Sequence, residues 1–226
     1  MLAGLEWVSW RFRNDRLPVN TLIKVCGVTT PADAEFICAA GVDLIGLNYY
    51  QNSSRHVTPA YAAEIARAAG DAKLVGVFVN PEYAEVRAAL DTVPLDWLQF
   101  HGSETPAFCA SFDKPFIKAT GVSGNFDFAS FAERYSHAFA YLLDAHDTQH
   151  HGGTGRVFDW QLWPESTKPL ILSGGLTAEN VSAAIARMHP WAVDVASGVE
   201  ADVQGRKDPT RVEAFVRKVL RSDGRA

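Results

Sequence analysis

Two glycine-containing turns near the C-terminal end of the sequence are suited to holding a phosphate group. Ser173-Gly174-Gly175 and Ser197-Gly198 each follow a short apolar run. Glycine lets the backbone approach an anion without an intervening Cβ, and neighbouring N–H groups can then donate to it. We expect phosphate contacts from Gly174, Gly175, Ser197 and Gly198. The first turn should lead into a helix opened by Thr177, whose N-terminus would add partial positive charge. The alternative is a pair of ordinary connecting turns.

A thiol and a carboxyl group stand where they could move protons. Cys26 closes the run Lys24-Val25-Cys26-Gly27, and Asp144 ends the apolar run 138–143. A thiolate can act as a general base, and a carboxylic acid can act as a general acid. A lone cysteine is more often a small buried apolar residue, and a carboxylate in this position equally often caps the next loop. Position alone therefore leaves both alternatives open.

Four further polar side chains are candidates for contacts with a substrate. Arg55 follows the second apolar run, and its planar guanidinium matches a carboxylate or a phosphate. Gln99 and His101 share one face at the end of the fourth run, where they would line a pocket or hydrogen-bond within their surroundings. Asp194 should point inward from the eighth run. Lys24 is its natural partner, because an isolated inward charge is costly.

The remaining histidines and cysteines receive structural interpretations. Three histidines share the polar loop after Asp144 without a closed set of ligands, so we expect no metal site. These histidines are His146, His150 and His151. The loop over 145–156 is long and glycine-rich, as a lid that excludes water or a flexible connection would be. Cys38 and Cys109 fall in helical stretches, and three cysteines fit no disulfide framework, which suits a reducing cytoplasm.

These candidates lie on alternating strand and helix patterns that begin at Thr21. The predicted strands are Leu22–Cys26, Leu44–Asn48, Leu74–Val79, Trp97–His101, Pro115–Ala119, Ala138–Asp144, Pro169–Ser173 and Ala192–Ala196. Alternation of this kind is typical of strand–helix units in a parallel sheet. Eight such units favour an α/β fold closed into a (βα)8 TIM barrel over an open, doubly wound sheet, and the phosphate site of such barrels follows strands seven and eight.

Period-two alternation predicts the direction of the side chains in the first strand. Lys24 and Cys26 should point into the barrel, while Ile23 and Val25 should face the helices. Predicted helix starts have a capping residue followed by proline. These pairs are Thr30-Pro31, Thr58-Pro59, Asn80-Pro81 and Asp208-Pro209. The final helix has one apolar face, made of Val212, Phe215, Val216, Val219 and Leu220.

Length and composition limit the class of protein. The chain has 226 residues, of which 47% are hydrophobic and 21% charged, and a formal net charge of −5. We therefore expect one barrel domain over 21–226, preceded by an N-terminal extension over 1–20. The negative charge argues against binding to nucleic acids or anionic membranes. No apolar run approaches the ~20 residues needed to span a bilayer, and Met1–Asn20 lacks the apolar core of a signal peptide. We expect a cytoplasmic monomer.

An ordered series of motifs resembles the phosphoribosylanthranilate isomerase family of tryptophan biosynthesis, over essentially Thr21 to the last helix. The motifs are KVCGVT at Lys24–Thr29, SSR ending at Arg55, GVFVN at Gly76–Asn80, QFHG at Gln99–Gly102, LLD ending at Asp144, GGTGRVFDW at Gly152–Trp160, LSGGL at Leu172–Leu176 and VDVASGVE at Val193–Glu200, followed by Gly205 and Lys207-Asp208. Asn48 stands where the family pattern tends to be more apolar.

The resemblance implies an Amadori rearrangement of N-(5-phosphoribosyl)anthranilate to 1-(2-carboxyphenylamino)-1-deoxyribulose 5-phosphate, with no cofactor. It implies that Asp144 is the general acid that opens the ribose ring and that Cys26 is the general base that takes the C2 proton. Arg55 would hold the anthranilate carboxylate, and the two glycine turns would hold the phosphate. The partner is then a small phosphosugar.

Two alternatives compete with this assignment. One is the related isomerase of histidine biosynthesis, or a bifunctional barrel that serves both pathways. Cys26 argues against it, because those relatives have an aspartate at this position. The other is a barrel that binds a phosphosugar without catalysis, and the presence of both Cys26 and Asp144 argues against that hypothesis.

Overall fold

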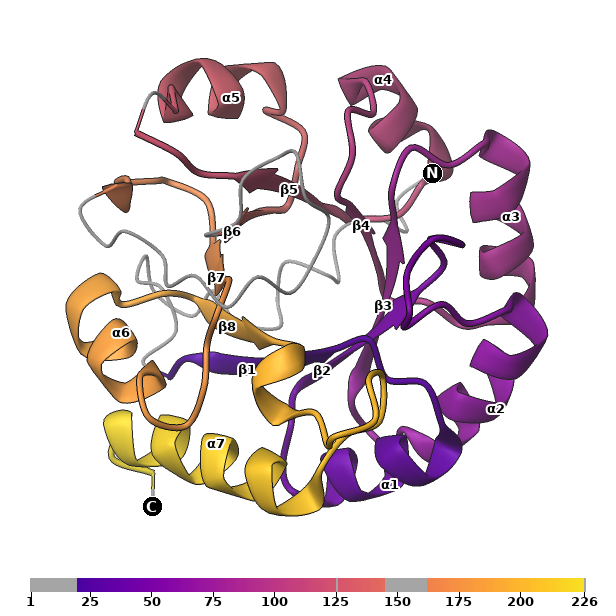
Figure 1. The fold of residues 1–226 in the computed structure, drawn as a ribbon. Coiled ribbons are helices and arrows are strands. Elements are labelled where there is room, and N and C mark those ends of the chain that lie inside the picture. The colour runs from indigo at the N-terminus through magenta and orange to yellow at the C-terminus, as the bar shows by residue number, and fades with distance from the viewer. Residues whose placement is uncertain (1–19, 125, 145–161, 226) are drawn as a thin grey trace.

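Eight parallel strands form a closed barrel in the computed structural model, which describes residues 20–124, 126–144 and 162–225 (Figure 1). The strands are β1 (Leu22–Cys26), β2 (Leu44–Asn48), β3 (Lys73–Phe78), β4 (Trp97–Phe100), β5 (Phe116–Gly121), β6 (Ala140–Asp144), β7 (Leu170–Ser173) and β8 (Ala192–Val195). Each strand pairs with the next one along the chain, and β8 pairs with β1. The predicted TIM barrel is confirmed, with some strand ends shifted by one or two residues.

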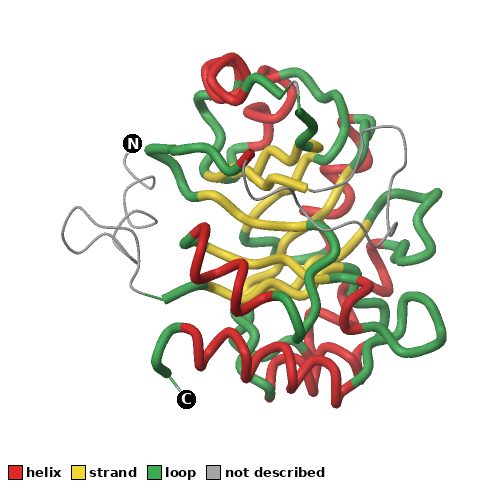
Figure 2. Tube along the Cα trace, turned by 60° about the vertical axis from the view of Figure 1, so that its left-hand side comes forward, coloured by secondary structure: helices red, strands yellow, loops and turns green. Residues whose placement is uncertain are grey.

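Helices surround the strands as an outer layer (Figures 1 and 2). Within the described ranges they are α1 (Pro31–Ala39), α2 (Pro59–Ala68), α3 (Tyr83–Thr92), α4 (Pro106–Cys109), η1 (Ala110–Phe112), α5 (Phe128–Arg134), α6 (Val181–Met188), η3 (Ser197–Val199) and α7 (Pro209–Ser222). None of the helices in this part of the chain is long and apolar enough to cross a membrane.

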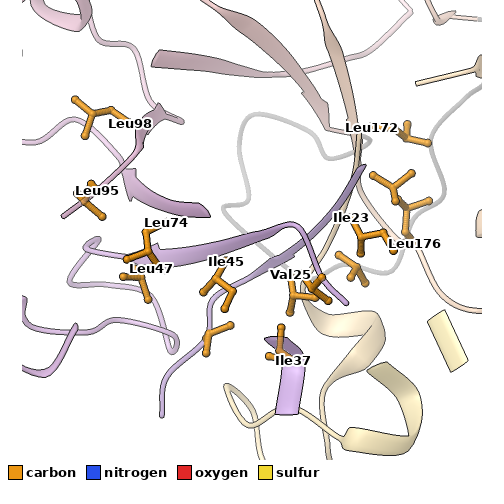
Figure 3. Packing of buried hydrophobic residues seen from close by; sticks show 14 of the residues in the cluster. Ile23, Val25, Ile37, Ile45, Leu47, Leu74, Leu95, Leu98, Leu172 and Leu176 are labelled. Atoms are coloured by element: carbon orange, nitrogen blue, oxygen red, sulfur yellow. The ribbon is translucent and has the colours of Figure 1, made fainter. Parts of the chain in front are cut away.

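Alternation along the strands divides the core into two layers. Ile23 and Val25 point outward from β1 and pack with Ile37 of α1, as expected for the helix-facing side (Figure 3). Lys24 lies on the opposite side and is fully buried. The interior layer contains aliphatic residues from several strands, including Leu44. The predicted side-chain directions in β1 are therefore confirmed.

Three aromatic rings fill the end of the barrel at which the strands begin. Trp97 opens β4, while Phe139 and Trp191 immediately precede β6 and β8. The ring centroids of Trp97 lie 5.3 Å from Phe139 and 5.7 Å from Trp191. We call these three residues the aromatic plug. It belongs to the interior core layer, so this end of the barrel is packed with side chains.

Three of the predicted helix caps are confirmed. Thr30, Thr58 and Asp208 each accept a hydrogen bond from the backbone N–H three residues later, and proline follows each of them. Thr105, which was not among the predicted caps, caps α4 in the same way. The apolar face of α7 is also confirmed, with four of its residues buried and Leu220 partly buried.

Two predicted helix starts are wrong. The chain does not enter α3 at Asn80, because Asn80 has a left-handed backbone (φ 47°) and its side chain accepts a hydrogen bond from Ser103 N at 2.7 Å. Glu82 caps α3 instead, through a capping box with Glu85. Thr177 does not open α6, because the helix begins at Val181 and Thr177 belongs to the turn before it.

The aromatic plug should contribute strongly to stability. Trp191 is 6% exposed, so Trp191→Ala removes a large buried ring and leaves a cavity. We expect the free energy of unfolding to fall by about 3–5 kcal/mol, measured by urea denaturation. Tyr61→Ala, at a position that is 39% exposed, serves as the control and should change it by no more than about 0.5 kcal/mol. Equal effects of the two substitutions would contradict this account of the core.

Candidate active site

A cavity of about 460 Å³ opens at the end of the barrel where the strands finish. It lies opposite the aromatic plug and is lined by residues from the ends of the strands and from the loops that follow them. Every residue predicted to take part in catalysis or binding lines it: Cys26, Arg55, Gln99, His101, Asp144, Gly174, Gly175, Asp194, Ser197 and Gly198. The fold therefore brings all the predicted site residues together.

Cys26 stands at the end of β1 beside a buried ion pair. Lys24 Nζ lies 2.8 Å from Asp194 Oδ1, and the two side chains are 0% and 6% exposed. The predicted pairing of Lys24 with Asp194 is therefore confirmed. Burial raises the pKa of the Cys26 thiol, while the charge of Lys24 acts in the opposite direction. The fraction of Cys26 that is ionised to the thiolate therefore depends on the balance between burial and the charge of Lys24.

Asp144 ends β6 and is linked to the ion pair by one hydroxyl group. Ser173 Oγ lies 3.4 Å from Asp144 Oδ2 and 3.5 Å from Asp194 Oδ2. These are long hydrogen bonds, and one hydroxyl proton can serve only one carboxylate at a time. A continuous line of polar groups thus runs from Asp144 through Ser173 and Asp194 to Lys24, beside Cys26.

Gln99 and His101 form a second set of polar groups near Asp144. Nε2 of Gln99 lies 3.3 Å from Nδ1 of His101, and Nε2 of His101 lies 3.9 Å from Asp144 Oδ2. Burial lowers the pKa of His101, although the Asp144 carboxylate opposes that shift. The imidazole is therefore neutral near pH 7. Both alternatives for this pair hold, because the two side chains line the cavity and contact each other.

Arg55 presents its guanidinium group to an internal carboxylate. Nε and Nη2 of Arg55 lie 2.5 and 2.9 Å from the two oxygens of Glu200, a bidentate arrangement. Lys207 Nζ lies 3.2 Å from the same carboxylate. Burial disfavours the charge of Glu200, but Arg55 and Lys207 outweigh it and hold the pKa of that carboxyl below its usual value. Gly27 is left-handed and leaves room for the side chain of Arg55, which a Cβ would overlap.

Glu200 and Lys207 were not among the predicted site residues. Both fall in the motif series of the sequence, Glu200 at the end of VDVASGVE and Lys207 shortly after it. Their spacing from Arg55 along the chain gives no sign that the three side chains meet. They meet because closure of the barrel places the loop after β8 beside the loop after β2.

The two glycine turns lie against each other at the ends of β7 and β8. A Cβ on Gly198 would overlap the carbonyl oxygen of Leu176, so the second turn can approach the first only as glycine. Gly174 and Gly175 both have left-handed backbones, with φ 95° and 62°. Asn180 stabilises this loop by donating to Gly175 O at 2.9 Å. The two turns form one glycine-rich wall of the cavity, which we call the glycine wall.

Some predictions lie elsewhere. Cys109 is buried in α4 and Cys38 is partly buried in α1, in agreement with their structural interpretation. The loop over 145–156 and its three histidines lie outside the described residues, as do residues 1–19 of the predicted extension. The lid and the extension therefore stay predictions.

The sequence of this chain matches one family of known proteins. The family model described as N-(5'phosphoribosyl)anthranilate (PRA) isomerase matches residues 23–218. A protein of Stutzerimonas stutzeri named N-(5'-phosphoribosyl)anthranilate isomerase is 48% identical over 198 residues, which cover 87% of this chain and 95% of that protein.

Solved structures agree with the sequence comparison. The crystal structure of phosphoribosyl anthranilate isomerase from Thermotoga maritima has a TM-score of 0.80 and 35% identity, covering 88% of this chain and 98% of that one. A crystal structure of phosphoribosyl anthranilate isomerase in complex with reduced 1-(o-carboxyphenylamino)-1-deoxyribulose 5-phosphate has a TM-score of 0.77 and 34% identity, covering 88% of this chain and 98% of that one. This chain belongs to the N-(5'-phosphoribosyl)anthranilate isomerase family.

Proposed function

We propose that this chain converts N-(5'-phosphoribosyl)anthranilate into 1-(2-carboxyphenylamino)-1-deoxyribulose 5-phosphate, with Asp144 as general acid and Cys26 as general base. Isomerisation of this substrate in tryptophan biosynthesis is the activity of the family. The observation that carries the assignment of residues is their arrangement, since Cys26, Asp144 and the glycine wall line a single cavity. A family member holds a phosphorylated ligand of this class in its crystal structure.

The acid step opens the ribose ring. Protonated Asp144 donates its proton to the ring oxygen. The lone pair of the anthranilate nitrogen forms a double bond to C1 as the bond between C1 and the ring oxygen breaks. The product is a protonated Schiff base. Ser173 and His101 lie beside the Asp144 carboxylate and can stabilise it once the proton has left. Because burial keeps His101 neutral, the imidazole can donate a hydrogen bond without a fixed positive charge.

The base step moves the double bond. The Cys26 thiolate takes the proton from C2, and the electrons of that C–H bond flow toward the iminium nitrogen, giving an enolamine. Tautomerisation of the enolamine to the C2 ketone completes the rearrangement. No net oxidation occurs, because C1 is reduced as C2 is oxidised within one molecule. No cofactor is needed for this sequence of proton transfers.

The two ends of the substrate would be held by different groups that line the cavity. The glycine wall has two left-handed glycines and the backbone amides of Ser197 and Gly198, which suit a phosphate. Arg55 lies in the loop after β2 and suits the anthranilate carboxylate, with Glu200 and Lys207 fixing its guanidinium group. Holding both ends would place the ribose between the acid and the base. The binding contacts would then orient the ribose for proton transfer.

We also propose that the protein works as a cytoplasmic monomer whose barrel domain covers 21–226. Three free cysteines suit a reducing compartment. The large apolar side chains exposed among the described residues are Tyr61 in α2, Tyr83 in α3 and Val203 in the loop before α7. Single exposed residues of this kind need no partner. The size of the purified protein, by light scattering, tests the oligomeric state.

Removing either proton-transfer group should slow turnover strongly. We expect Cys26→Ala and Asp144→Ala each to lower kcat by about 10²-fold or more, measured by the loss of anthranilate fluorescence from the substrate. Cys38→Ala, outside the cavity, is the control and should keep the parental kcat. A near-parental rate in either active-site variant would remove its assigned role.

Arg55 should act on binding at the anthranilate end alone. Arg55→Met removes the fork for the carboxylate, so we expect KM to rise about tenfold, which corresponds to about 1.4 kcal/mol. Competitive inhibition by inorganic phosphate reports on the glycine wall and should stay unchanged. If the variant loses phosphate inhibition as strongly as substrate affinity, Arg55 does not serve the carboxylate end specifically.

A further inference from the structure

We propose that Lys24, fixed by Asp194, is a positioning residue whose charge favours the thiolate form of Cys26. This proposal rests on the proposed role of Cys26 as general base. Lys24 and Cys26 occupy alternate positions on β1, so both point into the barrel. The charge of the Lys24 ammonium lowers the pKa of Cys26, while the ammonium itself is paired with Asp194.

Burial of the Lys24 ammonium costs free energy, because the charge loses its hydration. Its side chain is 0% exposed, and below it the barrel interior is filled by apolar residues such as Leu22 and Leu44. A buried ion pair often contributes less to stability than apolar residues of the same size, because both charges lose their hydration. The stability of the fold therefore does not explain why Lys24 and Asp194 are buried at this depth. An ammonium group beside the Cys26 thiol does have a chemical effect, because it favours the thiolate.

The neighbouring strand leaves space for this contact. Gly46 of β2 stands opposite Cys26 in the register of the barrel. A Cβ at Gly46 would lie 2.8 Å from Cys26 Sγ and 3.2 Å from Lys24 Nζ. One point on β2 thus lies within reach of both the sulfur and the ammonium, and the absence of a side chain there lets the two groups approach. Any larger residue would displace one of them.

Charged groups from four parts of the barrel face Cys26. Lys24 from β1 and Lys207 from the segment before α7 favour the thiolate, while Asp194 from β8 opposes it. Arg55, from the loop after β2, also interacts with Cys26. Glu200 neutralises part of this positive charge by pairing with both Arg55 and Lys207. Burial still outweighs these cations and raises the pKa of Cys26 above its ordinary value, and among them Lys24 lowers that pKa most.

Lys24 keeps its own proton throughout the reaction. When the thiolate takes the C2 proton, Sγ becomes a neutral thiol, and the ammonium remains paired with Asp194 at 2.8 Å. Return of the thiol to the thiolate releases that proton to solvent or to product. Asp194 has two opposing effects in this arrangement, since it fixes the ammonium in place and partly cancels its charge.

Alkylation of Cys26 by iodoacetamide measures the thiolate directly, without any need for turnover. Its rate is followed from pH 6 to 11 by mass spectrometry of the peptide that contains Cys26, with the Cys38 peptide as internal control, and a midpoint above this range is compared through the alkylation rates at one fixed pH below it. We expect Lys24→Met to raise the pH midpoint by at least about one unit, which is tenfold less thiolate at pH values below the midpoint. We expect Asp194→Asn to lower the midpoint. Opposite shifts identify an effect of charge, because general damage to the fold would move both variants alike.

A further pair of variants keeps the test valid if Lys24→Met does not fold. Asp194→Asn and Lys24→Met/Asp194→Asn differ only in Lys24, and neither leaves a buried carboxylate without its partner. The midpoint should be higher in the double variant. The acid limb of kcat/KM should follow the alkylation midpoint in every active variant. Equal midpoints in this pair, or a shift of the same sign in both single variants, would overturn the proposal.

The alkylation midpoints test the role of Lys24, and the activity of Cys26→Ala tests the role of Cys26 separately. If Cys26→Ala keeps its activity while the midpoints shift as expected, Lys24 controls the thiol but the thiol is not the base. If Cys26→Ala is inactive and the midpoints do not move, Cys26 is the base and Lys24 has only a structural role.

Discussion

Pairing of β8 with β1 is the constraint on which the site depends. The register of that pairing sets Lys24 directly opposite Asp194, so the last strand supplies the counter-charge for the first. The same closure brings the loop after β8, with Glu200, to the Arg55 side chain. An open sheet would leave these strands at opposite edges. The buried charges are therefore compatible with the fold only when the barrel is closed.

Closure also explains how a largely apolar barrel carries a polar active site. At the end where the strands begin, the aromatic plug and aliphatic side chains fill the interior. Toward the other end the interior side chains are polar, and they include the buried Lys24, Asp194, Ser173 and Gln99. These groups are satisfied largely by one another, since a buried polar group without a partner is costly. Gln99 Oε1 is an exception among the described side chains, and it lies in a residue that lines the cavity.

Much of this arrangement could be predicted from the sequence, because periodicity and strand ends carry the relevant information. Alternation in β1 was sufficient to place Lys24 and Cys26 inward, and the need to neutralise a buried charge was sufficient to pair Lys24 with Asp194. Contacts made by loops were not accessible in this way. Asn80 looked like a helix cap, but its side chain joins the loop after β3 to the loop after β4. Glu200 and Lys207 meet Arg55 only through tertiary structure, which local patterns do not encode.

We propose that closure of the barrel places an acid and a base around a single phosphorylated ribose. Turnover of N-(5'-phosphoribosyl)anthranilate by the purified chain, followed by fluorescence and by the mass of the product, tests this arrangement. We expect the anthranilate fluorescence to fall at a rate proportional to protein concentration and the product to have the mass of the substrate. Unchanged fluorescence, or a product of lower mass, would show that the chain does not catalyse this isomerisation.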